Sequence, residues 1–489
     1  MSLSFIDGCD FHVLILDENH LVVSMRPRMG PCFIHLLPTE TLCSILKAAL
    51  EDIVEQDMMG APNEKDRVLV GDLPLSPNTM ALVCRRWRDI VSSAPELWTR
   101  IFCILPEGRD AQTLDFQLKK AGNSIPIDLT ILADFGCKEG LIPDDKALLS
   151  IAPHVRRLRS LRIHCIMLSW IHHPIFDALT GDTPLLECLR LSYLGDVYGR
   201  RMWQPLLGLK CPRIRVFAIQ GKLVHYINHQ WLKENLADVK FVTISRYGYR
   251  YNATPSQGMW NPFPRWIPCL ILDQVDISSE DDSLQIGAEK LILRGGEGGL
   301  TSTFIDDNCK IIAMHGWDIF RERSWFRRLP LSNTLEFDGC QSSSPLQSQY
   351  MSLRGPKTYT WNGDTVIIMN SNLHTIDIVL AMLMATPEGH KGFVVRWGFM
   401  WPRVTTLTLT ARDDFVMELP VEQLKAMINF RWKAAGKSGT AKAESNDMNY
   451  KGVLPIMMLH VYGGPPLSHS DRSWFKEKVK DFVWDYKER

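Results

Sequence analysis

Apolar positions near the N-terminus recur at helical spacing. The first predicted helix opens at Pro38, where the missing N–H of proline costs no hydrogen bond. Its apolar stripe follows the spacing i, i+3, i+4 and i+7 at Leu42, Ile45, Leu46 and Ala49. One face of this helix is therefore expected to be apolar.

A second predicted helix and a short turn follow. The helix opens with Ser76 and Pro77, a cap residue followed by a proline. Its apolar face carries Met80, Val83, Cys84, Trp87 and Val91, and the turn after it holds Leu97, Trp98 and Ile101. Three helices of this size cannot bury their own apolar stripes, because so short a unit exposes too much of its surface. The unit is expected to need a partner.

The ordered motifs of this region resemble those of the F-box family. They read leucine-proline-x-glutamate-x-leucine from Leu37, valine-cysteine-x-x-tryptophan from Val83, and proline-x-leucine-tryptophan from Pro95. The resemblance covers residues 37 to 101 and implies an F-box receptor of the fungal type, which docks on the Skp adaptor and through it joins a cullin-based ubiquitin ligase. The residues it assigns to docking are Leu37, Pro38, Leu42, Ile45, Leu46, Val83, Cys84, Trp87, Leu97 and Trp98. A second interpretation is that Trp87 and Trp98 chiefly hold the three helices together.

The F-box-like region is predicted to span residues 36–105, with an acidic insertion at 51–75 that lengthens the link between the first two helices. Loop closure entropy rises only logarithmically with length, so the insertion need not spoil the fold. We expect it to be a mobile loop outside the docking surface. Residues 1–35 are interpreted as a short strand or a segment packed on the F-box, and the sequence leaves this open.

Beyond residue 110 the apolar spacing changes to the form LxxLxL, which is typical of short strands separated by turns. The middle anchors are 28, 28, 25, 28 and 21 residues apart, the spacing of leucine-rich repeats. They are Leu161, Leu189, Phe217, Val242, Leu270 and Leu291. Looser copies are predicted around Leu335-Phe337, Leu373-Ile376-Ile378, Val404-Leu407-Leu409 and Ile456-Leu459-Val461.

These strands predict an α/β repeat, an irregular leucine-rich-repeat-like solenoid over residues 110–489 that presents its sheet on the concave side. The asparagine expected after each strand is replaced, as at Ile166 and Leu194. The alternative is an α+β domain with evenly spaced strands. Surface loops are expected at 340–357 and 433–449, and Trp474 to Val483 is expected to form a terminal helix that caps the last repeat.

Composition limits the function. Lysine plus arginine equals aspartate plus glutamate at 55 each, so no bulk attraction to nucleic acid or an anionic membrane is implied. The 12 cysteines show no CxxC pairs, which fits reduced thiols in the cytoplasm or nucleus. No apolar run long enough to span a membrane occurs.

Candidate chemistry is sparse, and no catalytic residue, cofactor or metal site is predicted. Gly436-Lys437-Ser438 resembles the end of a phosphate loop, but Arg431 stands where its first glycine belongs. Aromatic residues in the connection after the strand at 242–244 are candidates for target binding, because aromatics on loops favour recognition. They are Tyr247, Tyr249, Tyr251, Trp260 and Trp266. The alternative is that these rings pack under their own loop.

The sequence thus predicts a non-catalytic substrate receptor of a cullin-based ubiquitin ligase. The F-box would bind the Skp adaptor, and the solenoid would bind a target protein that the sequence does not identify. Two alternatives remain: a protein-binding scaffold that recruits no ligase, and an enzyme of unrecognised type.

Overall fold

A computed structural model of the chain describes residues 11–17, 20–25, 36–59, 76–105, 110–133, 150–165, 179–193, 208–220, 229–245, 266–274, 287–295, 309–316, 332–341, 361–388, 396–399, 401–411, 417–438 and 452–486. The chain divides into two compact units. The first comprises residues 1–101 and 115–125, and the second comprises residues 102–114 and 126–489.

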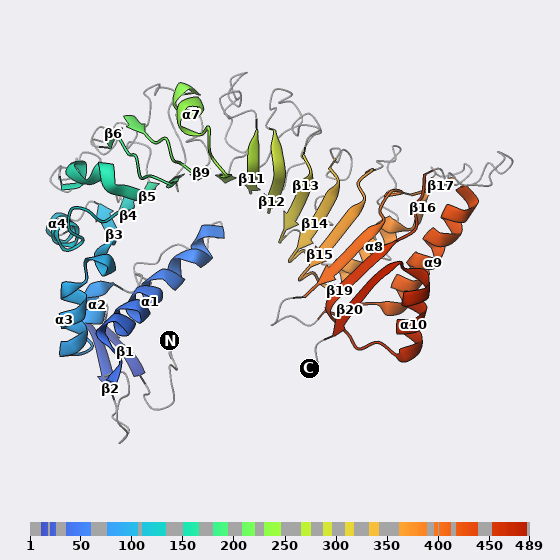
Figure 1. The fold of residues 1–489 in the computed structure, drawn as a ribbon, viewed down its shortest axis with the longest axis horizontal. Coiled ribbons are helices and arrows are strands. Elements are labelled where there is room, and N and C mark those ends of the chain that lie inside the picture. Colours follow the sequence, from blue (N-terminus) through green and yellow to red (C-terminus); the bar gives the residue numbers. More distant parts are fainter. Residues whose placement is uncertain are drawn as a thin grey trace. The chain divides into compact units, whose positions relative to one another are not determined.

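The first unit contains an antiparallel strand pair and a group of helices (Figure 1). Strands β1 (Phe11–Asp17) and β2 (His20–Met25) pair with each other, so the segment left open by the sequence contains a hairpin. The helices are α1 (Thr39–Met59), α2 (Pro77–Ala81) and α3 (Arg85–Ser93), followed by the 3-10 turn η3 (Pro95–Trp98). Within the unit α1 packs against α3 and η3.

Two predictions for the helical segments are wrong in detail. The first helix continues to Met59, so residues 51–59 of the acidic segment are helical and not a loop, and residues 60–75 lie outside the described residues. The second helix is split into α2 and α3. Ser76 caps α2 as predicted. Cys84 has an extended backbone and caps a new helix, α3, and its Sγ accepts a hydrogen bond from the Trp87 N–H.

The second unit is built on a parallel sheet of 14 strands (Figure 1). The strands follow one another in the sheet in their sequence order, and every pairing from β4 to β20 is parallel. They are β3 (Arg100–Leu105), β4 (Ile127–Ala133), β5 (Leu158–Cys165), β7 (Cys188–Tyr193), β9 (Val216–Gln220), β10 (Phe241–Ser245), β11 (Ile267–Asp273), β12 (Ala288–Arg294), β13 (Ile311–His315), β14 (Thr334–Asp338), β15 (Thr365–Met369), β18 (Thr406–Thr410), β19 (Met458–Gly464) and β20 (Asp481–Tyr486). This order is compatible with the predicted solenoid.

The predicted middle anchors are register partners of one another in this sheet. Leu161 pairs with Leu189, Leu189 with Phe217, and so on through Val242 and Leu270 to Leu291. The same register continues through Ile312, Leu335, Val366, Leu407 and Leu459 to Phe482. We call these aligned positions the core rungs; all are buried except Phe482, which is half-buried. Their side chains form the interior of the unit on one side of the sheet.

The connections contain further elements. They are α4 (Asp110–Lys120), η4 (Ala152–Arg157), α7 (His229–Asn235), α8 (Leu373–Leu383), α9 (Val421–Ser438) and α10 (His469–Lys478), with two small two-stranded sheets, β6 (Thr180–Asp182) with β8 (Gly208–Lys210) and β16 (Ala385–Glu388) with β17 (Arg396–Phe399). Helix α4 lies across the boundary of the two units, with its C-terminal half in the first.

Three predictions for this unit are corrected. The segment Leu373-Ile376-Ile378 is the helix α8 and not a strand. The C-terminal segment forms α10 and then the strand β20, so Phe482 and Val483 belong to a strand and not to a terminal helix. Residues 433–438 continue α9 and are not a loop. Of the loop predicted at 340–357, only residues 340 and 341 lie within the described residues.

Candidate functional site

Four of the residues assigned to docking form the interior of the helical unit. Leu42, Leu46, Leu97 and Trp98 are almost fully buried. The indole Nε1 of Trp98 donates to the carbonyl oxygen of Val91 at 2.7 Å, and its ring meets Phe116 edge-on at 5.5 Å between centroids. In this structure these four side chains face the interior and are not accessible to a partner. They hold the helices together, as the second interpretation of Trp98 stated.

The remaining docking residues reach the surface to different degrees. Ile45 is 44% exposed and Pro38 is exposed, whereas Leu37, Val83, Cys84 and Trp87 are half-buried. Two exposed leucines adjoin them that the sequence analysis did not select, Leu36 at 74% and Leu82 at 75%. Each lies one residue before a motif residue, Leu37 or Val83. The doubled apolar letters at these two places were the available signal, because two adjacent side chains of a turn cannot both face inward.

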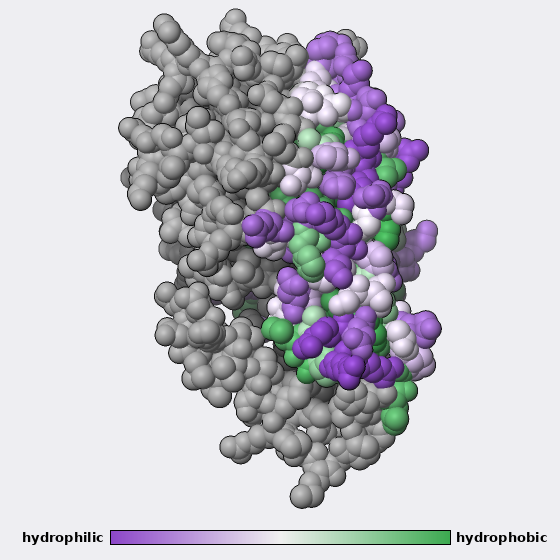
Figure 2. All heavy atoms as spheres, turned by 90° about the vertical axis from the view of Figure 1, so that its left-hand side faces the viewer, coloured by the Kyte–Doolittle hydropathy of each residue, from purple (hydrophilic) through white to green (hydrophobic). Residues whose placement is uncertain are grey.

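The side of the molecule shown in Figure 2 carries apolar side chains (green) among hydrophilic ones (purple). The apolar groups are scattered and do not form one continuous face.

Three arginines of the F-box-like region donate to backbone carbonyl oxygens. The guanidinium of Arg86 in α3 donates to the carbonyl oxygen of Leu37, and that of Arg100 donates to the carbonyl oxygen of Leu50. Arg88 donates through Nε to the carbonyl oxygen of Ala81 at 3.3 Å. The sequence analysis did not assign these arginines a role. The contacts of Arg86 and Arg100 fix the two halves of the F-box-like region relative to each other.

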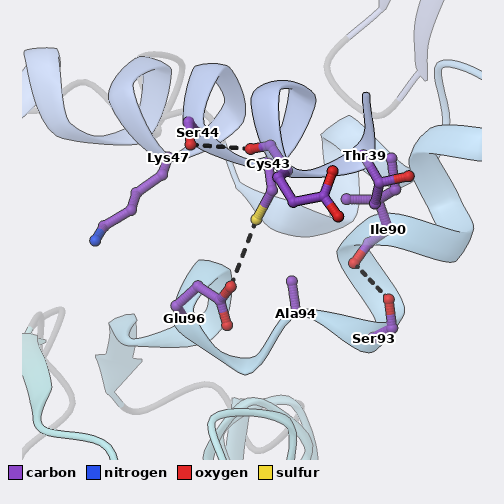
Figure 3. A pocket seen from close by; sticks show the side chains of 9 residues that line it. Thr39, Cys43, Ser44, Lys47, Ile90, Ser93, Ala94 and Glu96 are labelled. Carbon is purple, nitrogen blue, oxygen red and sulfur yellow. Dashed lines mark hydrogen bonds between the residues drawn. The ribbon is translucent and has the colours of Figure 1, made fainter. Parts of the chain in front are cut away.

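A shallow open groove of about 440 Å³ runs between α1 and the end of α3 (Figure 3). It is lined by Thr39, Glu40, Cys43, Ser44, Lys47, Ile90, Ser93, Ala94 and Glu96. The Cys43 thiol points at Glu96, with 3.5 Å between Sγ and Oε1. Burial and then the hydrogen bond to Glu96 raise the pKa of Cys43. The thiol stays protonated at neutral pH, so this pair does not supply an activated nucleophile.

Only one of the five predicted target-binding aromatics lies within the described residues. Trp266, immediately before β11, is 41% exposed. Tyr247, Tyr249, Tyr251 and Trp260 lie outside the described residues. The structure therefore places one of the five rings at the surface beside the parallel sheet.

The sheet presents its second side through the residues that alternate with the core rungs, which we call the open face. On β12 to β14 this face carries an ion pair across strands, Lys290 with Glu336 at 2.6 Å between Nζ and Oε2, and His315 lies 3.9 Å from the carboxylate of Asp338. Burial lowers the pKa of Arg294 and of His315. Beside these charges Cys269, Ile271, Ile292 and Ala313 form a buried apolar cluster. This part of the open face is largely buried, and the Nε2 of His315 has no hydrogen-bond partner among the described residues.

Among the described residues, no group of three or more His, Cys, Asp or Glu side chains is arranged to hold a metal ion. Every described cysteine is a free thiol. No helix in the part of the chain that the structure describes is both long and apolar enough to cross a membrane. No protein-family model matches the chain, and no curated protein is significantly similar to it in sequence.

Proposed function

We propose that the chain is an F-box substrate receptor of a cullin-based ubiquitin ligase. The helical unit would bind the Skp adaptor, and the leucine-rich-repeat-like unit would bind a target protein. The observation that carries this proposal is the exposure of Leu36, Ile45 and Leu82 beside the ordered F-box-like motifs, while the interior of the unit is already filled by Leu42, Leu46, Leu97 and Trp98. Beside a closed interior, these three exposed apolar side chains are the groups that a partner would cover.

The parallel sheet supports the second half of the proposal. A ladder of parallel strands in sequence order gives a long, rigid scaffold on which a protein partner can be held. Such a surface binds and positions a protein without chemistry of its own. The receptor would therefore act by proximity, raising the effective concentration of target lysines near the ubiquitin-charged enzyme.

The alternative is a binding scaffold that recruits no ligase. Both functions use the sheet in the same way, and they differ only in what the exposed leucines of the helical unit contact. In a scaffold these leucines would bind another protein or pack within the same chain, and the Skp adaptor would not co-purify.

Co-purification with the Skp adaptor tests the proposal. The intact chain should retain the purified adaptor, and the double substitution Leu37→Ala with Pro38→Ala should abolish this while leaving the circular dichroism nearly unchanged. Leu454, which is 43% exposed in the second unit, supplies the control. Leu454→Ala removes a similar exposed leucine and should leave adaptor binding intact. Undiminished binding by the double variant would contradict the assignment.

A further inference from the structure

Strand β20 ends the parallel sheet, and within the described residues it pairs only with β19. The N–H of Asp481 donates to the carbonyl oxygen of Met457 at 3.0 Å, which sets the direction of the backbone groups along β20. Because these groups alternate along a strand, the N–H and C=O of Phe482 and Trp484 point toward the outer edge. That edge can hydrogen-bond to a further strand.

The core side of β20 is already filled. Phe475 of α10 stacks on Phe482 and on Trp484, with ring centroids 5.4 and 5.5 Å apart. The opposite side shows Asp481, Val483 and Asp485, and all three are exposed. The open face of β20 therefore reads acid, apolar, acid.

The neighbouring strands add no positive lysine or arginine charge to this surface. The open face of β18 to β20 consists of Thr406, Thr408, Thr410, Met458, His460, Tyr462, Asp481, Val483 and Asp485, a set without lysine or arginine. His460 lies 3.2 Å from a carboxylate oxygen of Asp481. Asp485 forms no ion pair with another of the described residues, and Tyr462, opposite it in the register, is 39% exposed.

We infer that β20 binds an extended segment of a target protein whose side chains read basic, x, apolar, x, basic. The segment would add as a strand to the outer edge. Its lysine or arginine side chains would lie beside Asp481 and Asp485, and its apolar side chain would lie beside Val483, because opposite charges and apolar groups are the favourable cross-strand pairs. This inference deepens the proposed function. It rests on that function in one respect, because only a substrate receptor would make the bound segment part of a target protein.

A second copy of the chain fits this edge less well. Two β20 strands side by side would place carboxylates of one copy against carboxylates of the other, and like charges directly opposite each other destabilise a strand pair. Charge complementarity thus selects a basic segment over self-association.

The test uses the full chain and a fluorescent, capped heptapeptide of threonine with lysine at positions two and six and valine at position four. We expect saturable binding that weakens at least tenfold when both lysines are replaced by glutamate. Asp485→Lys should weaken it by a similar factor. Asp238→Lys is the matched control, because Asp238 is exposed in the same unit away from β20 and the change in net charge is identical.

A second peptide separates strand addition from simple charge attraction. N-methylation of alternate backbone amides keeps the charge but removes the hydrogen bonds of one edge, so binding should be lost. Equal binding of the methylated peptide, or no difference between Asp485→Lys and Asp238→Lys, would overturn the inference. Sedimentation that shows a dimer of the chain, and a change in that dimer with Asp485→Lys, would also overturn the inference, because the edge would then bind a second copy. The Skp adaptor is not needed for peptide binding. A chain that retains the adaptor but does not bind the peptide contradicts only this inference. A chain that binds the peptide but does not retain the adaptor contradicts only the proposed function.

Discussion

Arg431 in α9 donates through Nη1 to the carbonyl oxygen of Leu383, the last residue of α8, at 3.0 Å. The same fully buried guanidinium also donates to the carbonyl oxygens of Trp401, Pro402, Val404 and Leu454. One side chain thus satisfies backbone acceptors from α8, from the segment before β18 and from the segment before β19. Burial lowers the pKa of Arg431 to about 10, so the group remains charged at neutral pH.

Arg431→Met should therefore be strongly destabilising, because it leaves several buried carbonyl oxygens without a donor. The free energy of unfolding of the second unit should fall by more than about 3 kcal/mol. Urea unfolding followed by tryptophan fluorescence measures it. Lys433→Met, on an exposed position of the same helix, should change stability little. Equal effects of the two substitutions would show that the five hydrogen bonds do not matter.

Gly363 and Gly436 should respond oppositely to alanine. A Cβ on Gly363 would lie 2.0 Å from Cζ2 of Trp361, which is buried and hydrogen-bonded to Ser332, so Gly363→Ala should cost about 2 kcal/mol or more. A Cβ on Gly436 in α9 meets nothing within 4 Å, so Gly436→Ala should stabilise by up to about 1 kcal/mol. Thermal unfolding of both variants checks the pair. Similar shifts in the same direction would contradict the packing around Trp361.

His164 should make the second unit sensitive to acid. Burial first, and then the nearby Arg162 and Arg190, lower its pKa from 6.5 to about 4. The unfolded state therefore binds more protons between these values, so stability should fall as the pH drops from 6.5 toward 4, by about 2 kcal/mol after allowance for partial screening.

Unfolding free energies measured across this pH range test the effect. His164→Gln should flatten that part of the profile, since it removes the titrating ring. His469→Gln, at an exposed position, should leave the slope as it is. A profile that His164→Gln does not change would assign the acid sensitivity to another group.

Leu42 and Ile45 of α1 should separate folding from docking. Leu42→Ala empties a fully buried position and should cost about 2 to 5 kcal/mol of stability in the helical unit. Ile45→Asp changes an exposed position and should leave stability nearly unchanged while weakening co-purification with the Skp adaptor at least tenfold. Thermal unfolding and adaptor pull-down are measured on both. Retained adaptor binding by a folded Ile45→Asp chain would move the docking surface away from α1.

The sheet was predicted best where one strand face is apolar and the other polar. Leu161, Leu189 and Phe217 were identified from such alternation, and they align in register in the structure. Strands β13 and β15 were missed because each departs from the LxxLxL pattern at its first position, which is Cys309 for β13 and Gly363 for β15.

Helices buried on most sides misled the periodicity. In α8 the residues Ile376, Ile378 and Val379 are all buried, so their spacing fits a strand as well as a helix. The signal that distinguishes them is Asn372, whose side chain accepts a hydrogen bond from the Thr375 N–H and caps the helix. At the C-terminus, Phe475 and Phe482 stand seven residues apart like helical neighbours, but they meet by stacking across a turn.

The helical unit was predicted in outline but not in its division between interior and surface. An apolar stripe at i, i+3, i+4 and i+7 does not determine which of its side chains other helices bury and which stay exposed. The structure buries Leu42, Leu46 and Leu50 and leaves Ile45 and Ala49 exposed, because α3 and η3 contact only one side of α1. That choice depends on tertiary packing, which periodicity alone does not encode.

The constant register of the core rungs distinguishes insertions that this fold can tolerate from insertions that it cannot. Extra residues in a connection leave every rung aligned, as the unequal spacing of Leu291, Ile312, Leu335 and Val366 demonstrates. One extra residue inside a strand would turn all following side chains to the opposite side. Insertions and deletions among related sequences should therefore accumulate between the strands, whereas the strands themselves should change by substitution alone.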